Sequence, residues 1–416
     1  MPGYKHVKTA KKSLFKFAAL FFLFTLPCSF FPIPSLRAGV KYNPVVDLSL
    51  YGGQYYLDGD AAGFDWKFEA FVSPSVILNE NDELYPLYMG YYNGTQDIQE
   101  LAGGGVLTRQ RQEHTISLKY VHISDFNKVK PRVSYSRALI QETRDESWGD
   151  GLFNYNTMSA GIELEQEKPH GTFTESYDFF TAKYPNYASL ISQSASIDTA
   201  TFNELSSNAG TDVLDNASHR LAFSYTWFPG KTVMSSGLDF TYRKYGDQSV
   251  VAANGSFASD KRRDMILGLS YKVQKPAKPV DLAFSARMEY LTSNQNSYDA
   301  ARTKYIDDYY SYFQGEMGPS LNFYFKNDAS FGYALSFKKV YYLGRLAQDA
   351  SGNYKPSKTS QEFWLNSLYL RYPLSKKFFA KTIYSYQASS SNMRYEAGYR
   401  YNYRASSYMI GIDWEF

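Results

Sequence analysis

The sequence predicts an all-β protein: a transmembrane up-and-down antiparallel β-barrel of about 16 strands, with about 14 to 18 as the range. Segment after segment alternates apolar and polar residues with a period of two, as half-buried strands do. Short turn signals and longer polar connections follow one another in turn, which is typical of such barrels. After Phe31 no run approaches the roughly 18 apolar residues of a membrane-spanning helix.

The first residues have the composition of an export signal. Five lysines between Lys5 and Lys16 precede an apolar run from Phe17 to about Ile33, and Ala38 offers a small residue for cleavage. We therefore expect residues 1–38 to be a signal peptide and residues 39–416 to form the barrel. Cys28 raises the alternative of a lipoprotein, but Pro27 fits poorly with the small residue expected before a lipidated cysteine.

Removal of the signal reverses the sign of the net charge. The full chain has a formal charge of +3, but residues 1–38 contain six basic and no acidic residues, so the remainder has −3. Nucleic-acid binding then has no electrostatic basis, and no nucleic-acid partner is expected. Cys28 is the sole cysteine, so the mature chain has no disulfide and no thiol chemistry.

The strands are placed by their alternation. Leu282, Phe284 and Met288 share one face of a strand whose other face has Arg287 and Glu289. The expected strands are 44–56, 63–76, 83–92, 113–123, 131–141, 154–165, 173–183, 217–228, 232–244, 263–274, 280–292, 311–325, 329–341, 361–372, 377–387 and 404–416.

The connections divide into two lengths. Short turns are expected at 228–230, 275–279, 326–328 and 373–377, where Pro, Gly, Asn and Asp gather. Longer polar connections are expected near 245–261, 293–308, 342–360 and 388–403, and the longest is 184–216.

The abundant aromatic residues, 39 Tyr and 30 Phe, suit the aromatic girdles of a membrane barrel. A tyrosine-rich stretch at 298–312 is interpreted as such a girdle, with sugar stacking as the alternative.

The last strand supports a particular resemblance. Tyr408, Ile410, Ile412, Trp414 and Phe416 alternate with small or charged residues. This ending resembles the assembly signal of Gram-negative outer-membrane β-barrels, which implies recognition by the barrel assembly machinery. The last hairpin, with Ser389-Ser390-Ser391-Asn392 and Tyr401-Asn402-Tyr403-Arg404, is similar to barrels that follow helical repeats in polysaccharide or lipoprotein export. No such repeats precede the barrel in this sequence.

Residues arranged for catalysis are not found. Outside the signal there are four histidines, His114, His122, His170 and His219, none in a metal-ligand pair or beside a nucleophilic serine. Gly103-Gly104-Gly105 has no following Lys-Ser/Thr and is interpreted as a flexible turn. We expect no enzyme activity, no metal and no cofactor.

The faces opposite the apolar ones predict a polar lumen. Their charged residues are Asp65, Lys67, Glu69, Lys119, Glu163, Glu165, Arg220, Asp239, Arg243, Asp264, Lys272, Arg287, Glu289, Glu316, Lys338, Lys381, Asp413 and Glu415. Charges of both signs with Ser, Thr and Gly between them are typical of a water-filled channel lining, although opposite charges also occur in a plugged interior.

The expected function is therefore a porin-like channel for passive diffusion of small hydrophilic solutes, with outer-membrane lipid and lipopolysaccharide around it. The alternatives are a structural or surface-interaction barrel and an export barrel. The 184–216 connection has four acids, Asp198, Glu204, Asp212 and Asp215, and no Lys or Arg. They predict either a cation-attracting constriction or a solvated outer loop.

Overall fold

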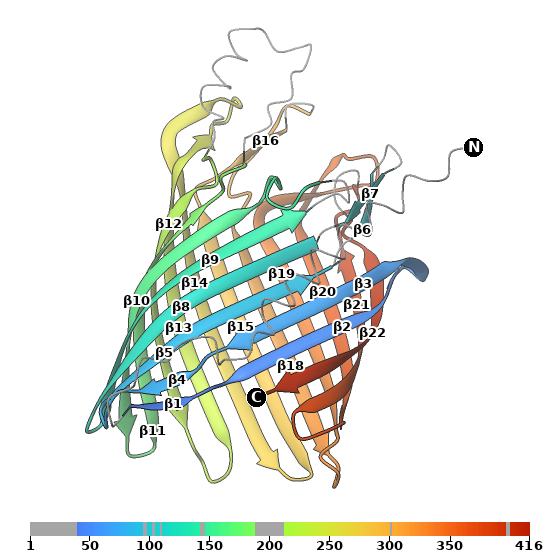
Figure 1. The fold of residues 1–416 in the computed structure, drawn as a ribbon. Helices are drawn as coiled ribbons and strands as arrows, with labels where there is room; N and C mark the ends of the chain where they lie inside the picture. Colours follow the sequence, from blue (N-terminus) through green and yellow to red (C-terminus); the bar gives the residue numbers. More distant parts are fainter. Residues whose placement is uncertain are drawn as a thin grey trace. The chain divides into compact units, whose positions relative to one another are not determined.

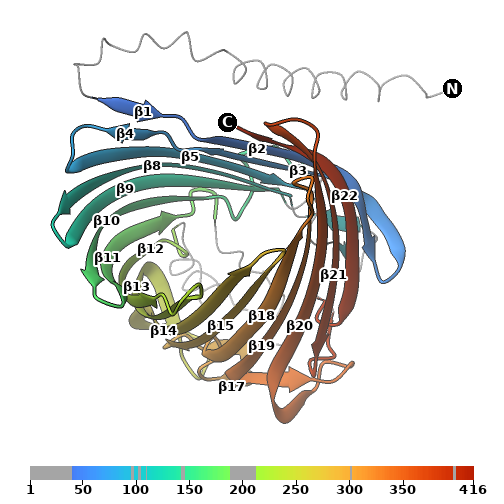
Figure 2. The ribbon, with the colours of Figure 1, turned by 90° about the horizontal axis from the view of Figure 1, so that it is seen from below.

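The first and last long strands pair with each other, so the sheet is closed. In the computed structural model β2 pairs antiparallel with β3 on one side and with β22 on the other. The backbone of Phe416 completes this seam, because Phe416 N–H donates to Val46 at 2.8 Å and Val46 N–H donates back at 2.9 Å. Figure 2, seen from below, shows the resulting ring with β2 beside β22.

The structure describes residues 40–94, 98–101, 105–108, 110–141, 146–187, 212–299, 302–396 and 400–416. The expected signal peptide lies outside these residues. The unit from Tyr42 to Phe416 holds the barrel.

Among the described residues the main sheet has 18 strands, of which β1 and β4 are three-residue extensions, so 16 strands form the barrel wall. These are β2 (Val46–Leu57), β3 (Asp60–Val72), β5 (Asp82–Asn93), β8 (Gln110–Ser124), β9 (Asn127–Gln141), β10 (Tyr155–Lys168), β11 (Gly171–Lys183), β12 (Asn216–Trp227), β13 (Val233–Val251), β14 (Phe257–Ala277), β15 (Val280–Ser293), β18 (Tyr312–Tyr324), β19 (Ser330–Gln348), β20 (Tyr354–Pro373), β21 (Phe378–Ser391) and β22 (Tyr403–Glu415). The short strands are β1 (Lys41–Asn43), β4 (Ser75–Ile77), β6 (Ile98–Leu101), β7 (Gly105–Thr108), β16 (Ser297–Asp299) and β17 (Lys304–Ile306).

The predicted fold class is confirmed, and each of the 16 predicted strands overlaps one wall strand. Consecutive wall strands are neighbours throughout, which is the up-and-down order. None of the described residues forms a helix long and apolar enough to span a membrane.

Short and long connections lie at opposite ends of the barrel (Figure 1). The predicted short turns after β12, β14, β18 and β20 are confirmed. One tight turn, Asp58-Gly59, lies at the long-loop end; both residues have positive φ, 51° and 98°, as a two-residue hairpin turn requires.

Two predicted long loops are instead extended hairpins. Residues 245–261 belong mostly to β13 and β14, and residues 342–360 to β19 and β20. Their composition is polar because the strands continue beyond the apolar band, where strand pairing no longer requires an apolar outer face. The alternation that marks the wall is therefore missing in these extensions.

Large apolar side chains cover the outer surface of the wall. Leu269 is 51 % exposed and Met288 55 %, and the two are cross-strand neighbours in the register of β14 and β15. Leu282 also faces outward, but it pairs with Lys275 close to the short-turn end. Leu269, at the middle of its strand, is therefore the better probe of the apolar band. Exposed apolar residues recur around the outer wall, for example Ile116 on β8, Phe223 on β12 and Ile410 on β22, and an apolar surface of this extent favours a lipid environment.

Candidate functional site: the inner face of the barrel

The predicted lumen residues share one face of the wall. In the strand registers they alternate with the exposed apolar residues; Asp239 and Asp413, for example, are only 7 % and 5 % exposed. The residues of this inner face are Lys67, Glu69, Lys119, Glu163, Glu165, Arg220, Asp239, Arg243, Asp264, Lys272, Arg287, Glu289, Glu316, Lys338, Lys381, Asp413 and Glu415. The backbone of Asp65 lies opposite Gly53 in the same alternation.

Ion pairs join three neighbouring strands on one side of the inner face. Lys130 of β9 bridges two acids of β10, at 2.7 Å from Glu163 and 2.5 Å from Glu165. Arg132 reaches across β10 and donates to both carboxylate oxygens of Asp178 on β11, at 2.6 to 3.0 Å. A bidentate pair of this kind holds both side chains against the wall.

A second series of pairs continues along β12 to β18. Arg287 lies 2.9 Å from Asp239 and 3.1 Å from Glu289, and Arg220 lies 3.9 Å from the same Asp239. The Glu289 carboxylate also accepts hydrogen bonds from Tyr312 and Gln314. Positive and negative groups thus alternate along the wall, and no ladder of a single sign is formed by these residues.

A third cluster ties the barrel seam from inside. Tyr51 of β2 donates a short hydrogen bond to the Asp413 carboxylate of β22. Lys381 and Arg371, on β21 and β20, lie 3.6 and 3.7 Å from the same carboxylate, and Arg371 also pairs with Glu415. Side chains from β2, β20 and β21 therefore converge on the buried Asp413 carboxylate of β22, on both sides of the closure.

The remaining inner-face charges differ in their partners. Ser336 donates to Glu316 at 3.1 Å, and the Lys338 ammonium lies 5.9 Å from the Phe363 ring centroid. Within the described part of the chain, Lys119 and Lys272 form no ion pair. Arg243 also forms none there, and its Nε is buried without a hydrogen-bond partner.

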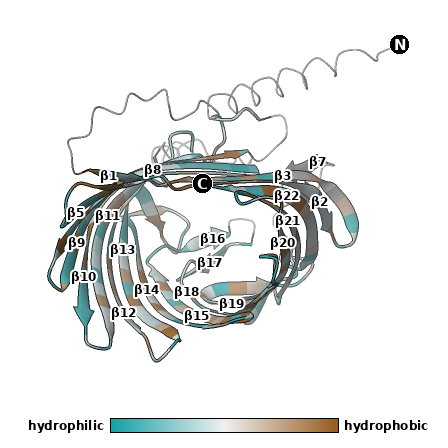
Figure 3. Ribbon diagram, turned by 60° about the horizontal axis from the view of Figure 1, so that its bottom comes forward, coloured by the Kyte–Doolittle hydropathy of each residue, from teal (hydrophilic) through white to brown (hydrophobic). Residues whose placement is uncertain are grey.

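The connection between β15 and β18 is a folded loop at the long-loop end. Its hairpin, β16 with β17, contacts the barrel wall at β19, and the oblique view of Figure 3 draws it beyond the near end of the barrel. Gln295 fastens the loop to the β13 extension by bonds with Ser249 and Val251, each 3.0 Å or shorter. Burial raises the pKa of Asp299, but hydrogen bonds from Tyr354 and Arg302 outweigh burial and hold this pKa below its ordinary value.

Tyrosines of this loop stack on arginines of the neighbouring hairpins. The Arg262 guanidinium lies 4.5 Å from the ring centroids of both Tyr245 and Tyr310, and Arg345 lies 4.3 Å from that of Tyr309. The interpretation of 298–312 as an aromatic girdle is wrong for Tyr309 and Tyr310, because these rings stack on arginines of strands distant in sequence. Sequence reasoning missed this packing of the loop; the Tyr-rich composition was the available signal.

The loop acids are only partly described. Asp198 and Glu204 lie outside the described residues. Asp212 has a positive φ of 71° in a turn, and the Asp215 carboxylate accepts the Tyr184 backbone N–H at 2.7 Å. Asp215 therefore anchors the end of its loop, whereas a cation constriction stays a prediction.

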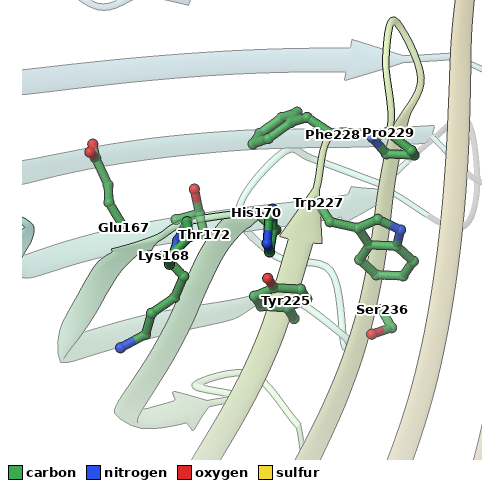
Figure 4. A pocket seen from close by; sticks show the side chains of 11 residues that line it. Glu167, Lys168, His170, Thr172, Tyr225, Trp227, Phe228, Pro229 and Ser236 are labelled. Carbon is green, nitrogen blue, oxygen red and sulfur yellow. The ribbon is translucent and has the colours of Figure 1, made fainter.

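An amphipathic groove of about 990 Å³ lies at the short-turn end, between the β10–β11 and β12–β13 turns (Figure 4). Tyr225, Trp227 and Phe228 supply rings, and Lys168 and His170 supply polar groups beside them. Tyr225 and Trp227 stack with ring centroids 5.9 Å apart. Rings next to a cation suit the boundary between lipid tails and headgroups.

The histidines are not gathered into a catalytic or metal-binding group. His114 and His219 face outward and contact Tyr88 and Tyr177 at 3.1 and 2.8 Å. His122 lies 2.8 Å from Asp82 at the short-turn end. Across the described ranges, no three His, Cys, Asp or Glu residues are placed to hold a metal ion.

No family model and no curated protein matches this chain. Solved structures do resemble it. A loop-deletion mutant of OmpT, an outer membrane protein of Vibrio cholerae, is 9 % identical, with a TM-score of 0.47 over 91 % of this chain and 100 % of that one. OccD3 of Pseudomonas aeruginosa is 6 % identical, with a TM-score of 0.45 over 91 % and 93 %. A bacterial polysaccharide outer membrane secretin is 9 % identical, with a TM-score of 0.41 over 89 % and 98 %.

The OmpT mutant and the polysaccharide secretin are outer-membrane proteins, the class that the terminal strand resembles. At such identities and TM-scores below 0.5, function has to be inferred from this chain's own residues.

Proposed function

We propose that the protein is an outer-membrane channel through which small hydrophilic solutes cross by passive diffusion. The observation that carries this proposal is the ion-paired inner face, best seen where Arg287 lies between Asp239 and Glu289. Charged side chains that have partners on the wall can remain ionised beside water, and they leave the field along the lumen nearly balanced. A channel of this kind admits solutes by size more than by charge.

The location follows from the outer surface. A closed barrel satisfies all its backbone hydrogen bonds within the wall, and its exposed apolar band then matches the lipid core. We accordingly place the protein in the outer membrane, reached by signal-peptide export and inserted by the barrel assembly machinery, which would read Phe416 and the alternating residues before it. Lipid and lipopolysaccharide are its surroundings, and catalysis, cofactors and nucleic acid have no part in the proposal.

A surface-interaction barrel is the second candidate. The folded β15–β18 loop favours it, because stacking of Tyr310 on Arg262 and of Tyr309 on Arg345 holds the loop in one arrangement, as a recognition surface needs.

Swelling of proteoliposomes in isosmotic sugars separates the two functions. We expect swelling that is fast with a pentose and slower with a disaccharide and a trisaccharide, because diffusion through a fixed opening falls with solute size. Liposomes without protein give the baseline. Folded barrel that supports no swelling with any sugar would contradict the channel and favour the surface function.

A further inference from the structure

We propose that a small cavity on the inner wall binds the carboxylate group of small aromatic acids through Arg243. The cavity lies at the long-loop end of β10 to β13 and has a volume of about 180 Å³. A water molecule takes about 30 Å³ in the liquid, so there is room for a solute several times larger. The proposal deepens the channel function and rests on it, because it names a class of solute that pauses inside the lumen.

The charge of Arg243 is not neutralised by the acid nearest in the register. Its cross-strand partner is Asp264 of β14, which is fully buried. Both oxygens of Asp264 are occupied, since Arg262 donates to each at 3.0 Å and Tyr245 donates to one at 3.2 Å. Arg262 therefore forms the ion pair with Asp264 that Arg243 would otherwise form.

The other acid near the cavity is also engaged. The Asp215 carboxylate accepts the Tyr184 backbone N–H, and its chain segment is held further because Gly246 N–H donates to the Asp215 carbonyl at 3.2 Å. Arg243 thus has no ion pair among the described residues, and its Nε is buried without a partner. A buried donor without an acceptor is costly, so an anion that supplies one is favoured.

The walls of the cavity define the rest of the ligand. Phe180, Tyr184 and Tyr245 offer aromatic surfaces, and Asn216 is fixed by a hydrogen bond to the Leu214 carbonyl at 3.0 Å. A guanidinium binds a carboxylate through two parallel hydrogen bonds, and rings favour a flat apolar body. Benzoate combines both features and is the natural probe.

Binding of benzoate to the folded barrel in detergent micelles tests the proposal, measured by calorimetry or by ligand-observed NMR. Benzamide, which has the same shape without the charge, is the ligand control. We expect Arg243→Gln to weaken benzoate binding by about 10-fold or more, in line with the loss of a charge-assisted pair, and Arg243→Lys to weaken it less. Arg220→Gln removes another inner-face arginine, one near Asp239, and should leave benzoate affinity unchanged.

Unchanged benzoate affinity in Arg243→Gln, or equal affinity of wild type for benzamide, would overturn the proposal. If Arg243→Gln does not fold, Phe180→Ala replaces it, with benzoate binding expected to fall and acetate binding to stay constant. The measurement needs no conduction through the barrel. A barrel that binds benzoate but causes no swelling therefore contradicts the channel alone, and one that swells without binding contradicts the carboxylate site alone.

Discussion

Leu269→Arg is expected to lower the free energy of unfolding from lipid by about 2–4 kcal/mol, the range for a cation at the midplane of a barrel's lipid face. Leu269 is half exposed on the outer surface, between Leu238 and Met288 in the register. In lipid the new guanidinium would lose water without gaining a partner. Denaturant titration of the barrel folded into lipid vesicles measures the change.

Ser285→Arg is the matched control on the neighbouring strand. Ser285 belongs to the inner face, where it pairs with Lys272 and Gly318, so an added arginine stays in water and should change stability by less than about 0.5 kcal/mol. If both arginines destabilise equally, the apolar band does not face lipid. A larger effect at Ser285 would mean that the faces are reversed.

Asp413→Asn should destabilise the barrel by about 2–3 kcal/mol, because Lys381 and Arg371 would be left beside a neutral side chain. The Asp413 side chain is 7 % exposed, so water screens these cations little. The substitution preserves shape and isolates the loss of charge. Since Tyr51 and Asp413 join β2 to β22, the barrel should open first at this seam.

Glu415→Gln provides the comparison for the seam cluster. It removes a negative charge from the same strand, and Arg371 again loses an ion-pair partner. The Glu415 side chain, however, is 50 % exposed. Exposed ion pairs contribute at most about 1 kcal/mol. Equal losses in the two variants, measured by the same denaturant titration, would show that Asp413 has no special place in the closure.

Much of the wall could be predicted because its signal is local. A strand in lipid needs an apolar residue at every second position, and each segment of the sequence shows this alternation, as in Leu282, Phe284 and Met288. The residues of the inner face can then be predicted too, because they occupy the alternate positions between the apolar ones. The extensions of β13 and β14 escaped prediction because strands surrounded by water have no such requirement.

The pairing of charges could not be predicted, because it depends on register and on competition. Sequence places Arg243 and Asp264 on the inner face but does not reveal that Arg262, two residues from Asp264, takes both carboxylate oxygens. The stacking of Tyr310 on Arg262 likewise joins segments almost 50 positions apart. Such partners emerge only when the strands are assembled.

Reversal potentials in planar bilayers test most directly whether the charged inner face lines a water-filled pathway. Arg287→Gln leaves Asp239 and Glu289 without their central cation, so in a KCl gradient the reversal potential should move toward that of K⁺. Asp239→Asn should move it toward that of Cl⁻, and both shifts should grow at low salt, where screening is weakest. Pores whose reversal potential is the same in wild type and both variants, or the absence of any pore, would contradict a lumen lined by these residues.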